Sequence, residues 1–228
     1  MKSYTQNRKV IYTAVIGNYD NLSKPEFYNN DFDYICFTDN KNLKSPGIWQ
    51  IKYIDHIKYI NIDNVRLARY IKTNPEIFVG NYDYSIWVDA NLIITGDMND
   101  LINKCSSGYL GFKHTYRDCI YDEAIKCIEW SLDDINIINS EIDFLKLEKY
   151  PKHNGLIETN VLCRKHTQEI KKVNQAWWEM IKKYSRRDQL SHMYIIWKYK
   201  LNINIYPEAA WKTKYFRLKE HIGSRVFK

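Results

Sequence analysis

The chain contains 228 residues, of which 45% are hydrophobic, 27% charged and 15% aromatic. This composition excludes a disordered or low-complexity protein and predicts a single folded domain over residues 1–228. A net charge of +7 favours anionic partners, but the basic residues form no block typical of a nucleic-acid-binding arm. We therefore expect a phosphate-bearing small molecule as the partner, and no nucleic acid.

Cysteine usage and hydropathy bear on the compartment. The five cysteines are odd in number and form no C-x-x-C pair, which argues against a disulfide framework and against a structural zinc site. No apolar stretch approaches the roughly 20 residues that span a bilayer, and the N-terminus lacks the apolar core of a signal peptide. The sequence thus predicts reduced thiols and a cytoplasmic protein, with any membrane contact peripheral.

The first half of the chain alternates between strand and helix patterns. Apolar, β-branched runs predict strands at 10–16 and 34–37, and a helical period begins near residue 64 and ends near Pro75. The stretch SIWVDAN lies in a predicted strand at 84–94, whose polar tip separates two apolar halves. A strand at 108–114 and a helix at 121–130 follow.

The second half opens with the least periodic segment, 132–151, which we interpret as a substrate-facing insertion. Beyond it the sequence predicts a strand at 156–164, a helix at 170–184, another helix that starts near 186–188, and a strand at 203–206. This alternation predicts an α/β fold with a mixed, mostly parallel central sheet flanked by helices. Ligands of such sheets bind beyond the carboxyl ends of the strands.

Two polar residues interrupt the SIWVDAN strand. Asp89 and Asn91 stand two positions apart, so in an extended segment their side chains point the same way and two oxygen ligands can converge on one hard cation. An Asx-type turn, in which both side chains cap local backbone, explains the same spacing. Both readings stay open at this level.

The helix that begins near residue 64 carries a basic face formed by Arg66, Arg69 and Lys72, opposite an apolar face. Guanidinium groups fit phosphate oxygens bidentately, so this face is a candidate phosphate site. A solvated surface is the ordinary alternative.

Several short motifs occur in a characteristic order: YTAVIGNYD, FTDN, SIWVDAN, RDCIYDEA, GLIETNVLCR and RDQLS. Together they resemble the glycosyltransferase-like family related to plant mucilage glycosyltransferases, over roughly residues 12–190. RDQLS and the C-terminal HIGSR are also similar, with altered spacing in the latter, to motifs of family 8 glycosyltransferases. The resemblance implies a GT-A (Rossmann-like) domain, with segment 132–151 on the acceptor side.

In GT-A enzymes a D-x-D pair holds a divalent metal, usually Mn²⁺, against the diphosphate of the donor. The resemblance therefore implies a metal, Mn²⁺ or alternatively Mg²⁺, held by Asp89, Asn91 and His221. Asparagine supplies a neutral oxygen where the family pattern has a second aspartate. The donor-binding residues it implies are Thr13, Ala14, Tyr19, Asp39, Arg66, Arg69, Lys72 and Asp89.

The Asp-Gln pair of RDQLS makes Asp188 and Gln189 the first catalytic candidates, since a carboxylate there can act as a base or stabilise an oxocarbenium-like centre. Asp188 also stands where a helix begins, so helix capping is the alternative. Glu158 and His114 are second candidates for acceptor binding or proton transfer. Arg117, Asp118 and Glu123 equally fit a structural charge cluster at a helix start.

The sequence therefore predicts a metal-assisted glycosyltransferase of polysaccharide biosynthesis. It would move a sugar from a nucleoside-diphosphate sugar, with UDP favoured, to a hydroxyl of a glycan or glycolipid. Two alternatives remain: a metal-dependent hydrolase or phosphotransferase acting on a lipid or phosphoester, and a non-catalytic module that binds sugar nucleotides or glycans.

Overall fold

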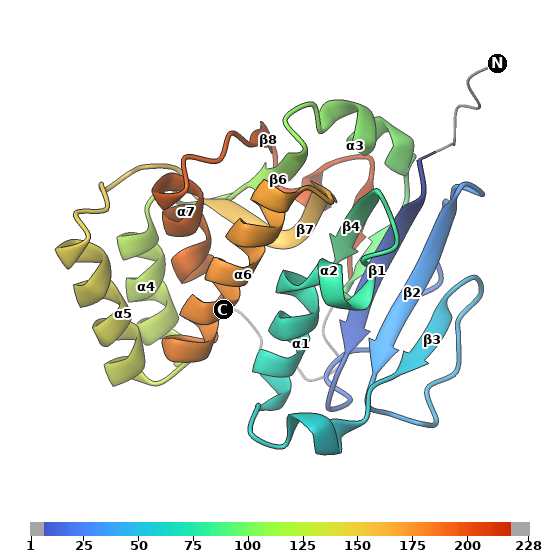
Figure 1. Ribbon diagram of the computed structural model, residues 1–228, viewed down its shortest axis with the longest axis horizontal. Coiled ribbons are helices and arrows are strands. Elements are labelled where there is room, and N and C mark those ends of the chain that lie inside the picture. The colour runs from blue at the N-terminus through green and yellow to red at the C-terminus, as the bar shows by residue number, and fades with distance from the viewer. Residues whose placement is uncertain (1–6, 220–228) are drawn as a thin grey trace.

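A seven-stranded sheet forms the centre of the protein in the computed structural model, which describes residues 7–219 (Figure 1). In spatial order its strands are β3 (Gln50–Tyr53), β2 (Phe32–Thr38), β1 (Lys9–Val15), β4 (Tyr84–Val88), β7 (Ile157–Lys165), β6 (Tyr109–Lys113) and β8 (Asn204–Tyr206). β7 is antiparallel to both of its neighbours, and the other pairs are parallel. The predicted mixed, mostly parallel sheet is confirmed.

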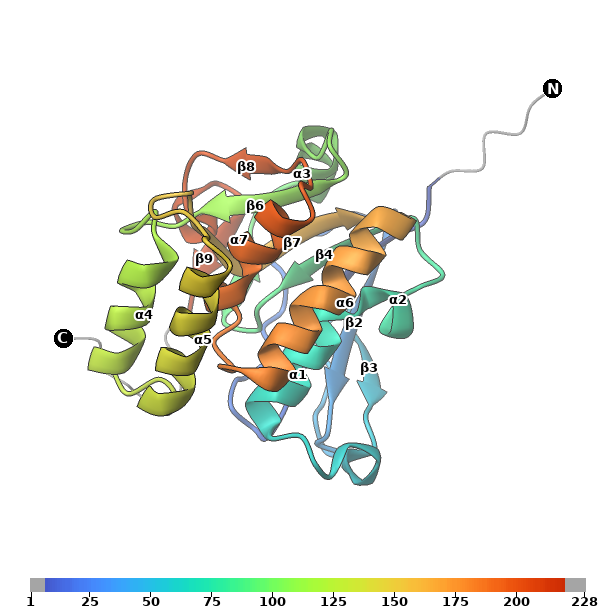
Figure 2. The same cartoon turned by 60° about the vertical axis from the view of Figure 1, so that its left-hand side comes forward.

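Helices form a thick layer on one face of this sheet (Figures 1 and 2). They are α1 (Asn64–Thr73), the short α2 (Pro75–Phe78), α4 (Ile120–Glu129), α5 (Ile135–Leu147), α6 (Gln168–Lys183) and α7 (Gln189–Lys198). The opposite face is covered by α3 (Met98–Lys104) and by a two-stranded sheet of β5 (Leu92–Ile94) and β9 (Phe216–Leu218). Two short 3₁₀ turns, η1 (His56–Tyr59) and η2 (Ala210–Lys212), complete the elements.

The central strands are buried on both faces, which explains their nearly continuous apolar sequences. Along β1, Ile11 packs into the core under α3 while Tyr12 packs into the core under the helical layer. Ile86 and Trp87 divide in the same way along β4. Side chains that follow Trp87 at intervals of two therefore face the helical layer.

Helix α1 forms as predicted. Asp63 caps its N-terminus by accepting the Arg66 backbone N–H, and the helix ends at Thr73, two residues before Pro75. Proline restricts the residue before it to extended conformations, so the chain breaks there and restarts as α2.

One sequence-based prediction about local structure was wrong, and one aperiodic segment contains a helix. The predicted strand at 84–94 is two strands, β4 and β5, which belong to different sheets because the chain turns at 89–92. The aperiodic segment 132–151 contains α5, whose buried residues Ile138, Glu141 and Leu145 do keep a helical spacing. A glutamate at a buried position obscured that period, because carboxylates seldom occupy a core.

The direction of the strands brings distant loops together. β1, β2, β4 and β6 run in the same direction, so their carboxyl ends share one edge of the sheet with the beginning of β7. All five cysteines are free and buried. Within residues 7–219, no helix combines the length and the apolar character needed to cross a membrane.

Candidate functional site

A buried ion pair lies behind this edge of the sheet. Lys72, near the end of α1, places its Nζ 2.5 Å from Oδ2 of Asp188, which precedes α7. Thr159 of β7 donates its hydroxyl to the same carboxylate oxygen at 2.9 Å. Burial alone would raise the pKa of Asp188, but the charges of Arg69 and Lys72 outweigh it and hold the pKa well below its usual range. A carboxylate with so low a pKa is a poor proton acceptor near neutral pH.

The capping role considered for Asp188 is wrong. Its side chain makes no capping hydrogen bond to the first turn of α7, because both carboxylate oxygens face Lys72, Thr159 and Arg69 instead. Only its backbone carbonyl serves the helix layer, accepting the indole N–H of Trp177 at 3.0 Å.

Asp89 lies at the end of β4 beside this pair. Its Oδ1 accepts the indole N–H of Trp87 at 2.6 Å and lies 3.7 Å from Nζ of Lys72. The backbone turns here, since Leu92 donates its N–H to the Asp89 carbonyl at 2.9 Å. The extended geometry that would point Asp89 and Asn91 the same way is thus absent, and the two side chains are related by a turn.

The arginines on the basic face of α1, Arg69 and Arg66, have different roles. Arg69 is partly exposed, and its Nε lies 3.2 Å from Oδ1 of Asp188, an ion-pair distance at an angle that makes no hydrogen bond. Among residues 7–219 its terminal nitrogens donate no hydrogen bond, and Asp89 and Asp20 act on its charge. The charge of Arg69 therefore interacts with carboxylates that follow β4 and β1.

Arg66, by contrast, is committed to the fold. Its Nε and Nη2 donate to the carbonyls of Ile181 and Tyr184 at the end of α6, and its Nη1 donates to Asp63. A guanidinium there satisfies carbonyls that the helix itself leaves unpaired. Arg66 therefore caps the C-terminal end of α6, and its hydrogen-bond donors are not available to a donor phosphate.

The end of β1 is tied to the end of β2 by Asp39. Its two carboxylate oxygens accept the backbone N–H of Gly17 at 3.0 and 3.1 Å. Gly17 has φ +64, and a Cβ at this position would collide with Asn64 of α1, so only glycine fits the turn. Thr13 is buried in β1 with an unpaired Oγ1, and Tyr19 is 65% exposed in the following loop.

The second group of catalytic candidates lies along the start of β7. Glu158 accepts hydrogen bonds from Thr115 and Asn160, while Gln189 donates weakly to the Ile157 carbonyl at 3.4 Å. Glu158 and Thr159 are successive strand residues, so Glu158 and Asp188 lie on opposite faces of the sheet. Gln189 is half-buried and remains the accessible member of the Asp-Gln pair.

His114 serves as a turn residue. Its Nδ1 accepts the backbone N–H groups of Tyr116 and Arg117, so the ring proton belongs on Nε2, which lies 3.6 Å from Glu123. Burial lowers the pKa of His114, and Glu123 is instead paired with Arg117 at 2.5 Å. The predicted structural charge cluster at the start of α4 therefore exists for Arg117 and Glu123.

A supporting layer that the motifs did not reveal fixes Lys72 from behind. Arg164 of β7 is fully buried and donates to the Lys72 carbonyl at 2.7 Å, and the Tyr12 hydroxyl donates to the same carbonyl at 2.9 Å. A buried cation thus caps the end of α1 and holds Lys72 in register. An arginine inside the apolar GLIETNVLCR strand was the available signal.

Two of the three predicted metal ligands, Asp89 and Asn91, lie among the described residues. The carboxylate of Asp89 is partly exposed and also lies 3.7 Å from Nζ of Lys72. With the amide oxygen of Asn91 it offers hard ligands that fit Mn²⁺ or Mg²⁺. The third predicted ligand, His221, lies outside the described residues.

Comparisons with known proteins identify one matching family and one similar solved structure. The TOD1/MUCI70 glycosyltransferase-like domain matches residues 1–221. No curated protein matches the sequence. Among solved structures, the apo structure of the WbbM bifunctional glycosyltransferase is similar with a TM-score of 0.47 and 11% identity, over 91% of this chain and 40% of that one. The chain thus spans less than half the length of that protein.

Proposed function

Because the chain belongs to the TOD1/MUCI70 glycosyltransferase-like domain family, we propose that it transfers a sugar from a nucleoside-diphosphate donor, with UDP favoured, to a hydroxyl of a glycan or glycolipid. The observation that carries the proposal is the position of Arg69, whose partly exposed guanidinium pairs with Asp188 and interacts electrostatically with Asp89 at the carboxyl end of β4. A guanidinium at such a position suits a diphosphate.

The roles of the other residues follow from their positions. Arg69 would bind the donor diphosphate directly, while Lys72 and Asp188 set the charge behind it. The β1 turn around Tyr19 and Asp39 would receive the nucleotide, with Thr13 and Ala14 at its floor. Asp89 and Asn91 would hold a divalent cation, which when bound would neutralise the charge of the departing diphosphate.

For the sugar side we propose Gln189 and Glu158 as the groups that meet the reacting centre. Gln189 is accessible and uncharged, and Glu158 is a half-buried carboxylate at the start of β7. Asp188 is assigned a positioning role because its charge is already used by two cations.

The acceptor belongs on the side of α5. A hollow of about 560 Å³ lies between α7 and the loop after α5, bordered by Glu148, Asn154, Met193 and Trp197. The 38% exposed Trp197 offers a ring on which a sugar can stack. We propose that this hollow receives part of a glycan.

The decisive experiment is a panel of nucleotide sugars measured by thermal shift, with and without Mn²⁺, because a ligand that binds only the native state raises the melting temperature. We expect one donor class to stabilise the protein and Asp89→Ala to lose the metal-dependent part of the shift. Release of nucleoside diphosphate from the same donor then separates an enzyme from a binding module. Stabilisation by phosphoesters, but by no nucleotide sugar, would favour the hydrolase alternative.

A further inference from the structure

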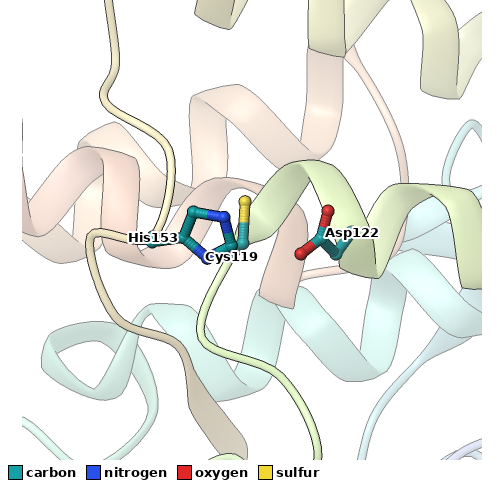
Figure 3. Close-up of side chains that lie close together, drawn as sticks. All are labelled: Cys119, Asp122 and His153. Atoms are coloured by element: carbon teal, nitrogen blue, oxygen red, sulfur yellow. The ribbon is translucent and has the colours of Figure 1, made fainter.

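Three potential metal ligands converge at the start of α4, away from Asp89 along the chain. Cys119 precedes the helix, Asp122 lies in its first turn, and His153 comes from the loop between α5 and β7. One ligand atom from each residue lies within 4.8 Å of the others. Figure 3 shows the Cys119 sulfur between the imidazole ring of His153 and the carboxylate of Asp122.

The thiol of Cys119 is buried and forms no hydrogen bond within residues 7–219. The residue is 1% exposed, and no hydrogen bond to its sulfur is formed by any residue in the described part of the chain. Cys105 and Cys127, by comparison, direct their sulfurs to a carbonyl and to a carboxylate. Cys119 also occupies the capping position of α4 without capping it. The Cys119 sulfur, placed between an imidazole and a carboxylate, is therefore available as a metal ligand.

The imidazole of His153 is already oriented by a neighbour. Its Nδ1 lies 2.8 Å from Oδ1 of Asp118, so the ring proton on Nδ1 is donated to that carboxylate and Nε2 is left as the lone-pair nitrogen. Metal-bound histidines characteristically hold their second nitrogen in this way. His153 adopts φ 53, a conformation uncommon for residues other than glycine, and its ring lies beside the start of α4 (Figure 3).

We propose that Cys119, Asp122 and His153 form a binding site for Zn²⁺, with Asp118 holding the imidazole and a water or a further ligand in the fourth position. A thiolate, an imidazole and a carboxylate suit this borderline-soft ion, whereas Mg²⁺ and Mn²⁺ prefer oxygen ligands. Tetrahedral zinc with these ligands needs ligand atoms roughly 3.3 to 3.6 Å apart, so the side chains must close by about 1 Å. Asp122 and His153 are exposed and free to do so.

The site differs from the zinc sites that the sequence argued against. Those need several cysteines in C-x-x-C pairs, whereas this set uses one cysteine, with Asp122 three residues later on the same helix turn and His153 brought in by the fold. Bound zinc would join the loop after α5 to the start of α4. It would therefore fix the loop that borders the hollow lined by Asn154.

Cobalt spectroscopy on the full chain tests the proposal. The protein is treated with chelator, reduced and titrated with Co²⁺, which reports thiolate ligation by a near-ultraviolet charge-transfer band and tetrahedral geometry by intense visible bands. We expect the thiolate band to saturate at one equivalent of Co²⁺ and Zn²⁺ to abolish it. Cys119→Ser should lose the charge-transfer band, and Asp118→Asn should weaken binding about 10- to 100-fold.

Matched variants separate this site from other thiols and carboxylates. Cys127→Ser removes a buried thiol of the same helix and should keep the band, as should Asp89→Ala at the donor edge. His153→Ala replaces an exposed side chain, so it should fold normally and lose most of the affinity. A protein that gives no thiolate band at millimolar Co²⁺, or a band that survives Cys119→Ser or His153→Ala, would overturn the site.

Discussion

Nζ of Lys72 lies 2.5 Å from Oδ2 of Asp188, and neither side chain exposes more than 3% of its surface. Removing one charge of a buried pair leaves the other uncompensated, so Lys72→Met should lower the free energy of unfolding by about 3 to 5 kcal/mol. In the double variant Lys72→Met/Asp188→Asn the loss should be smaller than the sum of the two single losses. Urea denaturation measures all three, and strictly additive losses would contradict the pairing.

Substitutions of Arg66 and Arg69, the two partly exposed arginines of α1, should affect different properties: one the stability of the protein, the other its affinity for the donor. Arg69→Ala should weaken donor binding by about tenfold or more, because a charge-assisted contact to phosphate is worth roughly 1.5 to 3 kcal/mol. Arg66→Ala should leave donor affinity unchanged but lower stability by about 1 to 2 kcal/mol, since it uncaps α6. Calorimetric titration and urea denaturation of both variants check this, and an equal loss of affinity in both would refute the division of roles.

Asp188 should support turnover without titrating. The charges of Arg69 and Lys72 hold the pKa of Asp188 well below its usual range, so the acidic limb of the pH–rate profile should belong to another group. Asp188→Asn should lower kcat and raise KM for the donor together, because Arg69 loses its anchor, while the shape of the profile stays the same. If Asp188→Asn instead abolishes the acidic limb, the carboxylate is the catalytic base after all.

Glu141 predicts an unusual dependence of stability on pH. Burial raises its pKa to about 8, against an ordinary value of 4.5, although the Ser185 N–H lowers it. The folded state therefore keeps a proton that the unfolded state releases, and stability falls as pH rises from about 4.5 to 8. Glu141→Gln should remove this loss and gain roughly 2 to 4 kcal/mol at pH 8 relative to pH 5.

Asp143→Asn is the matched control for that measurement, because Asp143 lies on the same helix with an exposed side chain. It should shift stability little and equally at both pH values. Melting curves at pH 5 and pH 8 decide between the variants. A pH-independent difference between Glu141→Gln and the wild type would mean that Glu141 is ionised in the fold.

The sequence predicted those parts of the fold that local chemistry determines. Apolar β-branched runs became β1, β2 and β4, and Pro75 ended α1 where expected. The turn at Asp89 escaped prediction because apolar residues continue on both sides of it, and periodicity does not register a change of sheet. Glu141 obscured the periodicity of α5, because the search for a helical period assumes that buried positions carry apolar residues.

The candidate site was predictable in its residue types and not in its pairings. Arg66, Arg69 and Lys72 share a face of α1, yet only the packing of α6 and α7 decides that Arg66 meets carbonyls while Lys72 meets Asp188. Thr159 and Arg164 came from a strand whose neighbours follow from sheet order, which short-range patterns do not encode. Family membership supports the proposed function, and the described contacts distinguish the roles of the individual residues.

The position of β7 has a consequence for synthesis of the protein. β7 lies between β4 and β6 but leaves the ribosome after both of them. In a nascent chain that ends at residue 156, β4 has one open edge and β6 lacks both of its neighbours, because β8 also follows β7 in the sequence. Unpaired strand edges can pair with other chains, so the incomplete sheet is most prone to aggregation before β7 is added. β7 brings Arg164 to Lys72, and Thr159 gains its partner Asp188 only after α6 has followed.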